Sequence, residues 1–180
     1  MLDRIHIFGA SGSGTSTLAA ALAARHGHAH VEADDILWEP TAPPFEKVRE
    51  RAARQEILRQ RLEPAGRWVL AGSVCGWGDV IVARFDLAML LSTPTEVRLA
   101  RLRTRERERY GTAIDPGGAM HERSLAFFEW TARYDEGGPE IRSRTLHDTW
   151  LGALPCRTAR LDGRAPIEQL VASVESLAHP

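Results

Sequence analysis

The chain alternates between short apolar runs and longer segments in which apolar residues recur every three or four positions. The short runs predict five strands, at residues 5–8, 28–33, 68–73, 85–91 and 157–162. The longer segments predict helices at residues 18–24, at 45–62, from Pro94 onwards, at 120–134 and at 167–177. Nearly continuous apolar strands separated by helices are typical of a parallel sheet covered on both faces. We therefore expect an α/β protein with three layers, α/β/α, around a five-stranded parallel sheet.

A glycine-rich loop joins the first predicted strand to the first helix. In the phosphate-loop pattern G-x-x-x-x-G-K-[ST], Gly9 and Gly14 take the glycine positions and Ser16 the hydroxyl position. Thr15 stands where the pattern has lysine. Small residues let successive N–H groups point inward at a helix N-terminus, which makes an anion-binding concavity. The residues predicted to hold phosphates are Gly9, Ser11, Gly12, Ser13, Gly14, Thr15, Ser16 and Thr17.

The hydroxyl of Ser16 is the predicted magnesium ligand of this loop, because Mg²⁺ prefers hard oxygen donors. The alternative for the whole loop is a glycine-rich turn that binds no ligand. With Thr15 at the lysine position, the loop lacks the positive charge that the lysine usually supplies. Of 23 basic residues only Lys47 is a lysine, so a cation that replaces the loop lysine is expected to be an arginine.

The overall composition narrows the set of partners. The 180 residues carry a net charge of −1, which predicts no general affinity for nucleic acid or anionic membranes. No apolar run reaches the roughly 20 residues that span a bilayer, and the N-terminus leads straight into the first strand without a signal sequence. We therefore expect a cytoplasmic protein with no membrane partner.

Acidic and small residues follow the second and third predicted strands. Because ligands bind at the carboxyl ends of parallel strands, Asp35 is predicted to orient an acceptor hydroxyl or a Mg²⁺-bound water. The alternative is that Asp34 or Asp35 caps a helical turn. Trp38 is interpreted either as a flat wall of the site or as a core residue. Gly72 and Ser73 either border an acceptor pocket or form a tight turn.

The helix that starts near Pro94 is rich in arginine. Arg101, Arg105 and Arg109 share one face at spacings of four residues, while apolar residues stop at Leu102, which predicts an arm that projects from the core. The face is interpreted as a phosphate contact, or alternatively as a solvated face paired with glutamates. Glycine pairs at 117–118 and 137–138 then predict a mobile lid, or static loops, over residues 110–145.

These features together resemble the P-loop kinases of the nucleoside monophosphate and shikimate/gluconate kinase group, including bacterial proteins described as adenylate kinase-like. The resemblance is carried by the loop at 9–17, Asp34–Asp35, Gly72–Ser73 and the arginine helix that leads into the lid. It covers essentially the whole chain. It implies one P-loop kinase-like domain over residues 1–180 with strand order 2-3-1-4-5 and a lid at about residues 110–145.

The resemblance also implies ATP-dependent phosphoryl transfer. ATP would place its phosphates on the loop and its base between the arginine helix and the turn after the last strand, with Mg²⁺ on Ser16. Arg101, Arg105, Arg142 or Arg144 would approach the transferring group when the lid closes and would offset the missing lysine. The acceptor would lie between Asp35, the helix at 45–62 and Gly72–Ser73.

The sequence leaves the acceptor open. Arginines available for an acceptor phosphate, as in nucleoside monophosphate kinases, are Arg49, Arg51, Arg54, Arg59 and Arg61, whereas Asp35 suits an acceptor hydroxyl. The expected partners are a nucleoside triphosphate and a small phosphoryl acceptor, with the protein a monomer or homodimer. The competing hypothesis is a nucleotide-binding regulatory module with weak or no kinase activity.

Overall fold

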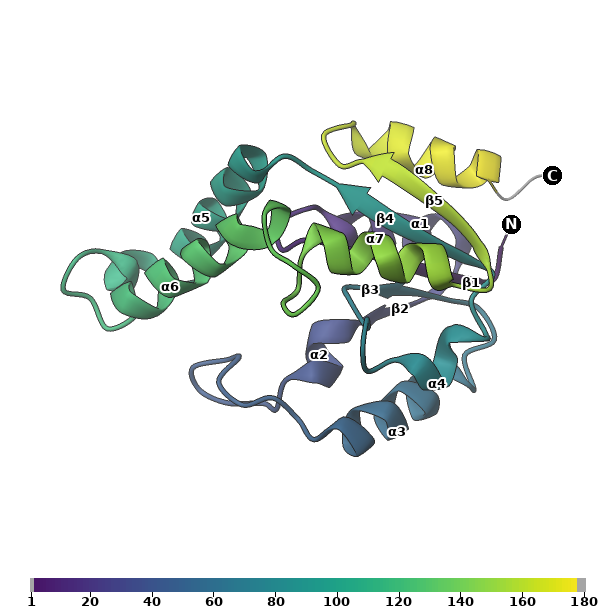
Figure 1. Cartoon of the computed structure of the whole chain (residues 1–180), viewed down its shortest axis with the longest axis horizontal. Helices are drawn as coiled ribbons and strands as arrows, with labels where there is room; N and C mark the ends of the chain where they lie inside the picture. The colour runs from purple at the N-terminus through teal and green to yellow at the C-terminus, as the bar shows by residue number, and fades with distance from the viewer. Residues whose placement is uncertain (1, 178–180) are drawn as a thin grey trace.

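The computed structural model describes residues 2–177 and centres on a five-stranded parallel sheet (Figure 1). The strand order is β2-β3-β1-β4-β5 and every pairing is parallel, which confirms the predicted sheet and its order. The strands are β1 (Arg4–Gly9), β2 (Ala29–Glu32), β3 (Trp68–Ala71), β4 (Leu87–Ser92) and β5 (Arg157–Asp162).

Helices cover both faces of the sheet. The α-helices are α1 (Thr15–His26), α2 (Ala33–Leu37), α3 (Arg51–Leu62), α4 (Asp79–Val82), α5 (Thr95–Tyr110), α6 (His121–Ala132), α7 (Arg144–Ala153) and α8 (Ile167–Leu177), with 3₁₀ turns η1 (Gly111–Ile114) and η2 (Arg133–Asp135). Within residues 2–177, none of these helices has the length and apolar character needed to cross a bilayer.

Alternate residues of each central strand enter two separate cores, as the period of two in a strand requires. Val69 and Ala71 of β3 pack with the apolar faces of α1 and α8. Trp68 and Leu70 of the same strand pack on the other side with apolar residues of α3, α4 and α7. These two cores make the three layers that the sequence predicts.

Helices α5 and α6 extend together beyond the sheet and are called the arm here (Figure 1). The arm is anchored by Arg98, whose side chain is completely buried. Its guanidinium donates to the Thr93 carbonyl at 3.0 Å and to Asp135 at 3.2 Å. A buried arginine with backbone and carboxylate acceptors therefore joins the start of α5 to the turn that follows α6.

The prediction of one helix over residues 45–62 is wrong in its first part. Residues 38–50 form an irregular excursion, and α3 begins only at Arg51. Trp38 and Val48 form an isolated antiparallel bridge, and Phe45 has φ = 65°. A positive φ lies outside the right-handed helical region, so the apolar spacing continues here without a helix.

Candidate functional site

The glycine-rich loop has the backbone shape that the sequence predicts. Gly12 and Gly14 have φ values of 80° and 101°, a region that glycine adopts without steric cost. Helix α1 starts directly after Gly14, and no side chain within residues 2–177 caps its first N–H groups. Those amides are suited to bind an anion.

The loop is held tightly by its neighbours. A Cβ on Gly9 would lie 2.5 Å from the Leu91 carbonyl oxygen, and a Cβ on Gly12 would lie 2.8 Å from the Arg98 carbonyl oxygen. The Thr93 hydroxyl donates to the Ser13 carbonyl at 3.1 Å. The end of β4 and the arm therefore fix the loop's conformation, which favours a preformed phosphate cradle.

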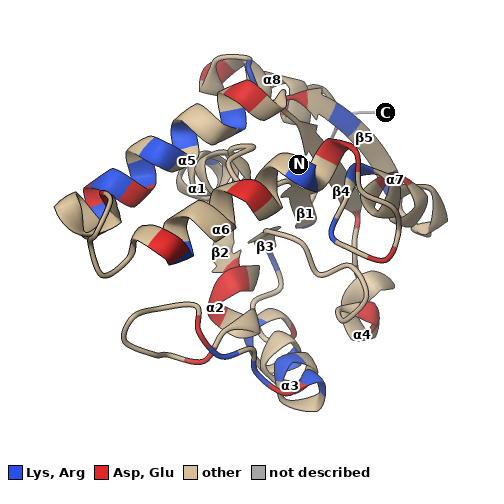
Figure 2. Ribbon diagram, turned by 60° about the vertical axis from the view of Figure 1, so that its left-hand side comes forward, with Lys and Arg blue, Asp and Glu red and all other residues tan. Residues whose placement is uncertain are grey.

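A cavity of about 920 Å³ opens onto this loop. Its walls come from the loop, α2, the excursion at 38–50 and the arm. Basic residues recur along α5 and acidic residues lie on α2 (Figure 2). The lining residues are Ala10, Ser11, Gly12, Gly14, Thr15, Ser16 and Thr17 of the loop, the acidic Glu32, Asp34, Asp35 and Glu106, the basic Arg101, Arg105, Arg109, Arg123 and Arg142, the aromatic Trp38, Phe45, Tyr110, Phe127 and Trp130, and Leu37, Gly72 and Leu102.

Most residues predicted from the sequence meet in this cavity. Asp35, Arg101, Arg105 and Arg142 line it together with six of the eight predicted loop residues. The other two loop residues, Gly9 and Ser13, lie behind the lining. Their carbonyls accept hydrogen bonds from Arg142 and Arg101, so they contribute by positioning arginines.

Two arginines contact the loop directly. Arg101 donates to the Gly163 carbonyl at 3.0 Å and to the Ser13 carbonyl at 3.4 Å. Arg142 donates to the Gly9 carbonyl at 3.0 Å, and its Nε is shielded from solvent without a hydrogen-bond partner within residues 2–177. An arginine N–H without a partner at such a place is suited to donate a hydrogen bond to a phosphate oxygen.

Burial lowers the pKa of Arg105 and Arg142, and the negative charge of Asp34 acts in the opposite direction on both. Asp34 therefore belongs to the same electrostatic site as these two guanidinium groups. The sequence reasoning selected Asp35 alone, although Asp34 is its neighbour in α2. Both carboxylates are exposed and line the cavity.

Glu32 is a further site residue that the sequence reasoning missed. The Ser16 hydroxyl donates to Glu32 Oε2 at 3.0 Å. This places a carboxylate beside the predicted magnesium ligand, and oxygen donors of this kind fit Mg²⁺. The available signal was that Glu32 ends a strand two residues before Asp34, at the edge of the sheet where ligands bind.

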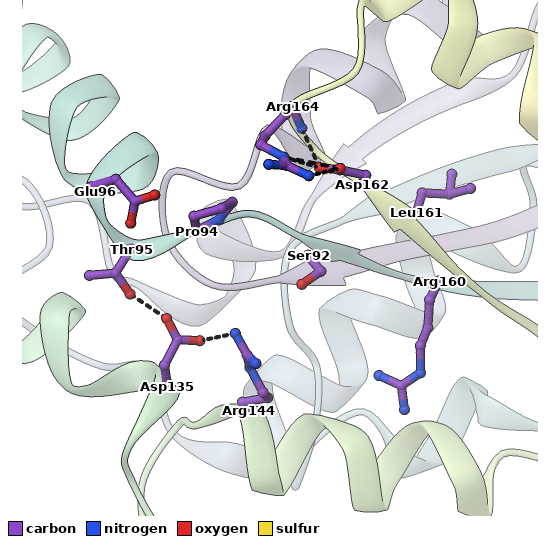
Figure 3. A pocket seen from close by; sticks show the side chains of 10 residues that line it. All are labelled: Ser92, Pro94, Thr95, Glu96, Asp135, Arg144, Arg160, Leu161, Asp162 and Arg164. Carbon is purple, nitrogen blue, oxygen red and sulfur yellow. Dashed lines mark hydrogen bonds and ion pairs between the residues drawn. The ribbon is translucent and has the colours of Figure 1, made fainter.

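Arg144 lies outside the loop cavity. It pairs with Asp135 at 2.6 Å and lines a second cavity of about 600 Å³ at the ends of β4 and β5 (Figure 3). Asp135 also accepts from Thr95 and Arg98. The structure therefore separates Arg144 from the other predicted catalytic residues, and its nearest charge is a carboxylate.

Ser73 also lies outside the lining, whereas Gly72 is part of it. The Ser73 hydroxyl is hydrogen-bonded to His147 Nε2 at 2.9 Å, and His147 Nδ1 is hydrogen-bonded to the Tyr134 hydroxyl at 2.9 Å. Burial raises the pKa of Tyr134 to about 12. This hydrogen-bonded chain, in which His147 and Tyr134 are buried, lies near Arg142 beneath the cavity and is called the buried floor here.

The arginines at and near α3 are not in the cavity either. Arg49 donates to the carbonyls of Ile36 and Trp38, and Arg51 pairs with Asp79 at 2.9 Å. None of the five arginines considered for an acceptor phosphate is among the lining residues.

Sequence comparison identifies relatives over most of the chain. The family model described as AAA domain matches residues 5–123. A Bacillus subtilis (strain 168) protein named uncharacterized protein YqaC is 42% identical over 171 residues, covering 95% of this chain and 94% of that protein. The cytidylate kinase of Pyrococcus horikoshii is 32% identical over 112 residues, which covers 57% of each chain.

Several solved kinase structures share the fold at low sequence identity. A deoxyadenosine kinase from M. mycoides superposes with a TM-score of 0.61 at 11% identity, covering 98% of this chain and all of that one (100%). A shikimate kinase from Acinetobacter baumannii superposes with a TM-score of 0.58 at 18% identity, covering 99% and 93%. With its loop, its sheet order and these relatives, the chain belongs to the AAA domain family and has the P-loop fold of the nucleoside monophosphate and shikimate kinases.

Proposed function

We propose that the protein is a kinase that transfers the γ-phosphoryl group of ATP to a hydroxyl of a small molecule. The observation that carries this proposal is one cavity that joins the phosphate loop to Arg101, Arg105 and Arg142 and to the exposed carboxylates of Asp34 and Asp35. A cavity of about 920 Å³ is large enough for a nucleotide's phosphates and a second small molecule. The kinase relatives and kinase neighbours support the same reaction class.

The loop half of the cavity is proposed to hold the triphosphate on the amides of residues 10–17. Ser16 and Glu32 would hold Mg²⁺, which supplies charge neutralisation to the phosphate oxygens. Arg101, Arg105 and Arg142 would supply the positive charge that a loop lysine provides elsewhere. Lys47 does not take this role, because it pairs with Glu39 at 2.9 Å and lies outside the lining.

The acceptor half is proposed to work through Asp34 and Asp35. The acceptor hydroxyl oxygen forms the new bond to the γ-phosphorus, the bond between that phosphorus and the β–γ bridging oxygen breaks, and ADP leaves. The hydroxyl proton passes to the carboxylate that orients it. Positioning and charge neutralisation supply most of the catalysis in such transfers.

The segment from residue 110 to 145 is proposed to act as a lid within one kinase domain. Arg123 donates to the Pro44 carbonyl and pairs with Glu46 at 3.4 Å, while the Arg109 guanidinium lies 5.1 Å from the Phe45 ring centroid. These contacts join the arm to the excursion at 38–50 across the cavity. Amide hydrogen exchange over residues 115–145 is expected to slow on addition of ATP and Mg²⁺, and unchanged exchange would contradict lid closure.

A transfer assay with γ-labelled ATP and Mg²⁺ over a panel of small hydroxyl compounds tests the function. Binding of ATP with transfer to no acceptor, or only hydrolysis, would instead support the regulatory module. Arg142→Gln is expected to lower kcat about 10³-fold, the order found for arginines that neutralise a transferring phosphoryl group. Arg61→Gln, on the exposed surface of α3, is the matched control and leaves kcat unchanged.

A double-mutant cycle tests whether Arg142 supplies the charge of the missing loop lysine or whether its substitution only damages the site. Thr15→Lys restores the usual loop cation, so Arg142→Gln in that background is expected to lose much less activity. Equal losses in both backgrounds would show that Arg142 does not stand in for the missing lysine.

A further inference from the structure

The cavity has an aromatic section that the phosphate-transfer chemistry does not require. Trp38 and Phe45 contribute rings from the excursion at 38–50, and Phe127 and Trp130 contribute rings from α6. The Phe127 and Trp130 rings are stacked at 24° with centroids 6.3 Å apart. The Trp38 and Phe45 rings meet edge to face at 6.0 Å. Two separate elements therefore present aromatic surface to one small-molecule cavity.

Two of these rings are unusually open to solvent for their size. Phe45 is 37% exposed and Trp130 is 40% exposed. Packing within the described chain leaves a large part of both rings uncovered, although each lies on the cavity wall. Exposed aromatic surface that lines a cavity is suited to stack against a flat ligand ring.

The charges nearby favour a neutral acceptor. Asp34 and Asp35 are exposed in the cavity, and within residues 2–177 neither carboxylate lies within 4.0 Å of a basic side chain, although the charge of Asp34 acts on Arg105 and Arg142. A phosphate on the acceptor would meet two negative charges, whereas a hydroxyl would donate a hydrogen bond to either carboxylate.

Arg101, Arg105 and Arg142 are assigned to the triphosphate in the proposed function, and the other two lining arginines contact protein groups. Arg109 lies over Phe45 and pairs with Glu106 at 3.5 Å, while Arg123 is occupied by Pro44 and Glu46. Arg109 thus directs one donor to the arm, and Arg123 directs two donors to the excursion.

We propose that the acceptor is a nucleoside: a flat heteroaromatic base attached to a hydroxyl-bearing sugar, without a phosphate of its own. The inference rests on the proposed kinase function and specifies its substrate class. The base stacks on the aromatic section, and a sugar hydroxyl donates to Asp34 or Asp35. The reaction converts ATP and the nucleoside to ADP and a nucleoside monophosphate, with the hydroxyl proton released through the carboxylate.

The test compares nucleosides, the matching nucleoside 5′-monophosphates and ring-free polyols such as gluconate as acceptors of label from ATP. Trp130→Ala is expected to raise the KM for the nucleoside about tenfold, which is the order of one lost base–aromatic stack. The KM for ATP stays unchanged, and Trp130→Phe restores most of the nucleoside KM. Leu125→Ala is the matched control, because Leu125 is 44% exposed on the same helix but lies outside the cavity.

A second readout keeps the two proposals distinguishable. Nucleoside binding in the absence of ATP is measured by calorimetry on the wild type and on Trp130→Ala. Binding that depends on Trp130 without any transfer overturns the kinase proposal and supports the ring site. Transfer to a monophosphate or polyol in preference to nucleosides, or a nucleoside KM that Trp130→Ala leaves unchanged, overturns the acceptor inference and leaves the kinase in place. Neither binding nor transfer overturns both.

Discussion

Two buried histidines make the stability of this protein depend on pH. His6 and His147 are both 0% exposed, one in β1 and the other in α7 beneath the site. Burial lowers the pKa of each to about 3. For His6 the hydrogen bond to the Leu70 carbonyl raises the pKa and opposes part of this effect. For His147 the positive charge of Arg142 lowers the pKa further. Both imidazoles are therefore neutral in the folded protein at any pH above about 4.

The sign and size of the effect follow from proton linkage. The unfolded chain has histidine pKa values near 6.5, so between pH 6.5 and 3 it binds protons that the folded chain does not. The free energy of unfolding therefore falls as the pH is lowered through this window. From pH 8 to pH 5.5 each histidine contributes a loss of about 1.4 kcal/mol, or about 3 kcal/mol for the pair. His28, whose pKa burial also lowers, acts in the same direction.

Urea unfolding at pH 8 and pH 5.5 measures this loss. His6→Phe fits the stack that His6 forms with Phe8 and Phe85, and removes the titrating group. We expect this variant to reduce the pH-dependent loss by about 1.4 kcal/mol and the double variant with His147→Gln to remove about 3 kcal/mol of it. Carboxylates whose pKa lies below its usual value, such as Asp162 at about 2, contribute only at lower pH. A loss of the same size in the double variant would refute the assignment to these histidines.

Three further predictions concern the arm, the loop and the buried floor, and all are checked by urea unfolding at pH 8. Gly12→Ala is expected to cost at least 2 kcal/mol more than Gly27→Ala, about the cost of overpacking, because both glycines have positive φ but only Gly12 would place a Cβ against backbone, at 2.8 Å. Asp135→Ala is expected to cost about 3 kcal/mol, since it leaves the buried guanidinium of Arg98 without its carboxylate; a cost below 1 kcal/mol would contradict the anchor. Tyr134→Phe is expected to cost about 1–2 kcal/mol through the lost hydrogen bond to the buried imidazole of α7, and a neutral result would contradict it.

The layers of the fold were predictable because each strand and helix has its own apolar pattern over a short stretch of sequence. Strand β5 and helix α8 begin and end at the predicted residues, since their apolar periods and flanking turns leave few alternatives. The start of the helix at 45–62 was wrong because Phe45 and Val48 keep a helical spacing for another reason. Val48 pairs with Trp38 in an isolated antiparallel bridge. These residues are ten positions apart, and the apolar period of a helix gives no sign of such a pairing.

The site was predictable where it depends on the backbone and less so where it depends on side-chain direction. Loop residues and Asp35 meet because strand ends share one edge of the sheet. Ser73 follows β3 by two residues, but its hydroxyl is hydrogen-bonded to His147, which is 74 residues away in sequence. Arg144 follows Arg142 by two residues yet enters a different cavity, because Asp135 holds it. Such partners are set by tertiary packing, which a local pattern does not contain.

With threonine at the lysine position of the phosphate loop, the positive charge of the site depends on where the arginines are anchored. A lysine within the loop carries its charge on the same backbone that binds the phosphates. Arg101 instead belongs to the arm, and Arg142 lies within the predicted lid, two residues before α7. Each donates to a loop carbonyl with one side of its planar fork. The positive charge at the loop therefore depends on the placement of segments distant in sequence. A loop lysine would make nucleotide binding independent of those segments, whereas this arrangement makes the charged site complete only when arm, loop and the residues before α7 are in contact.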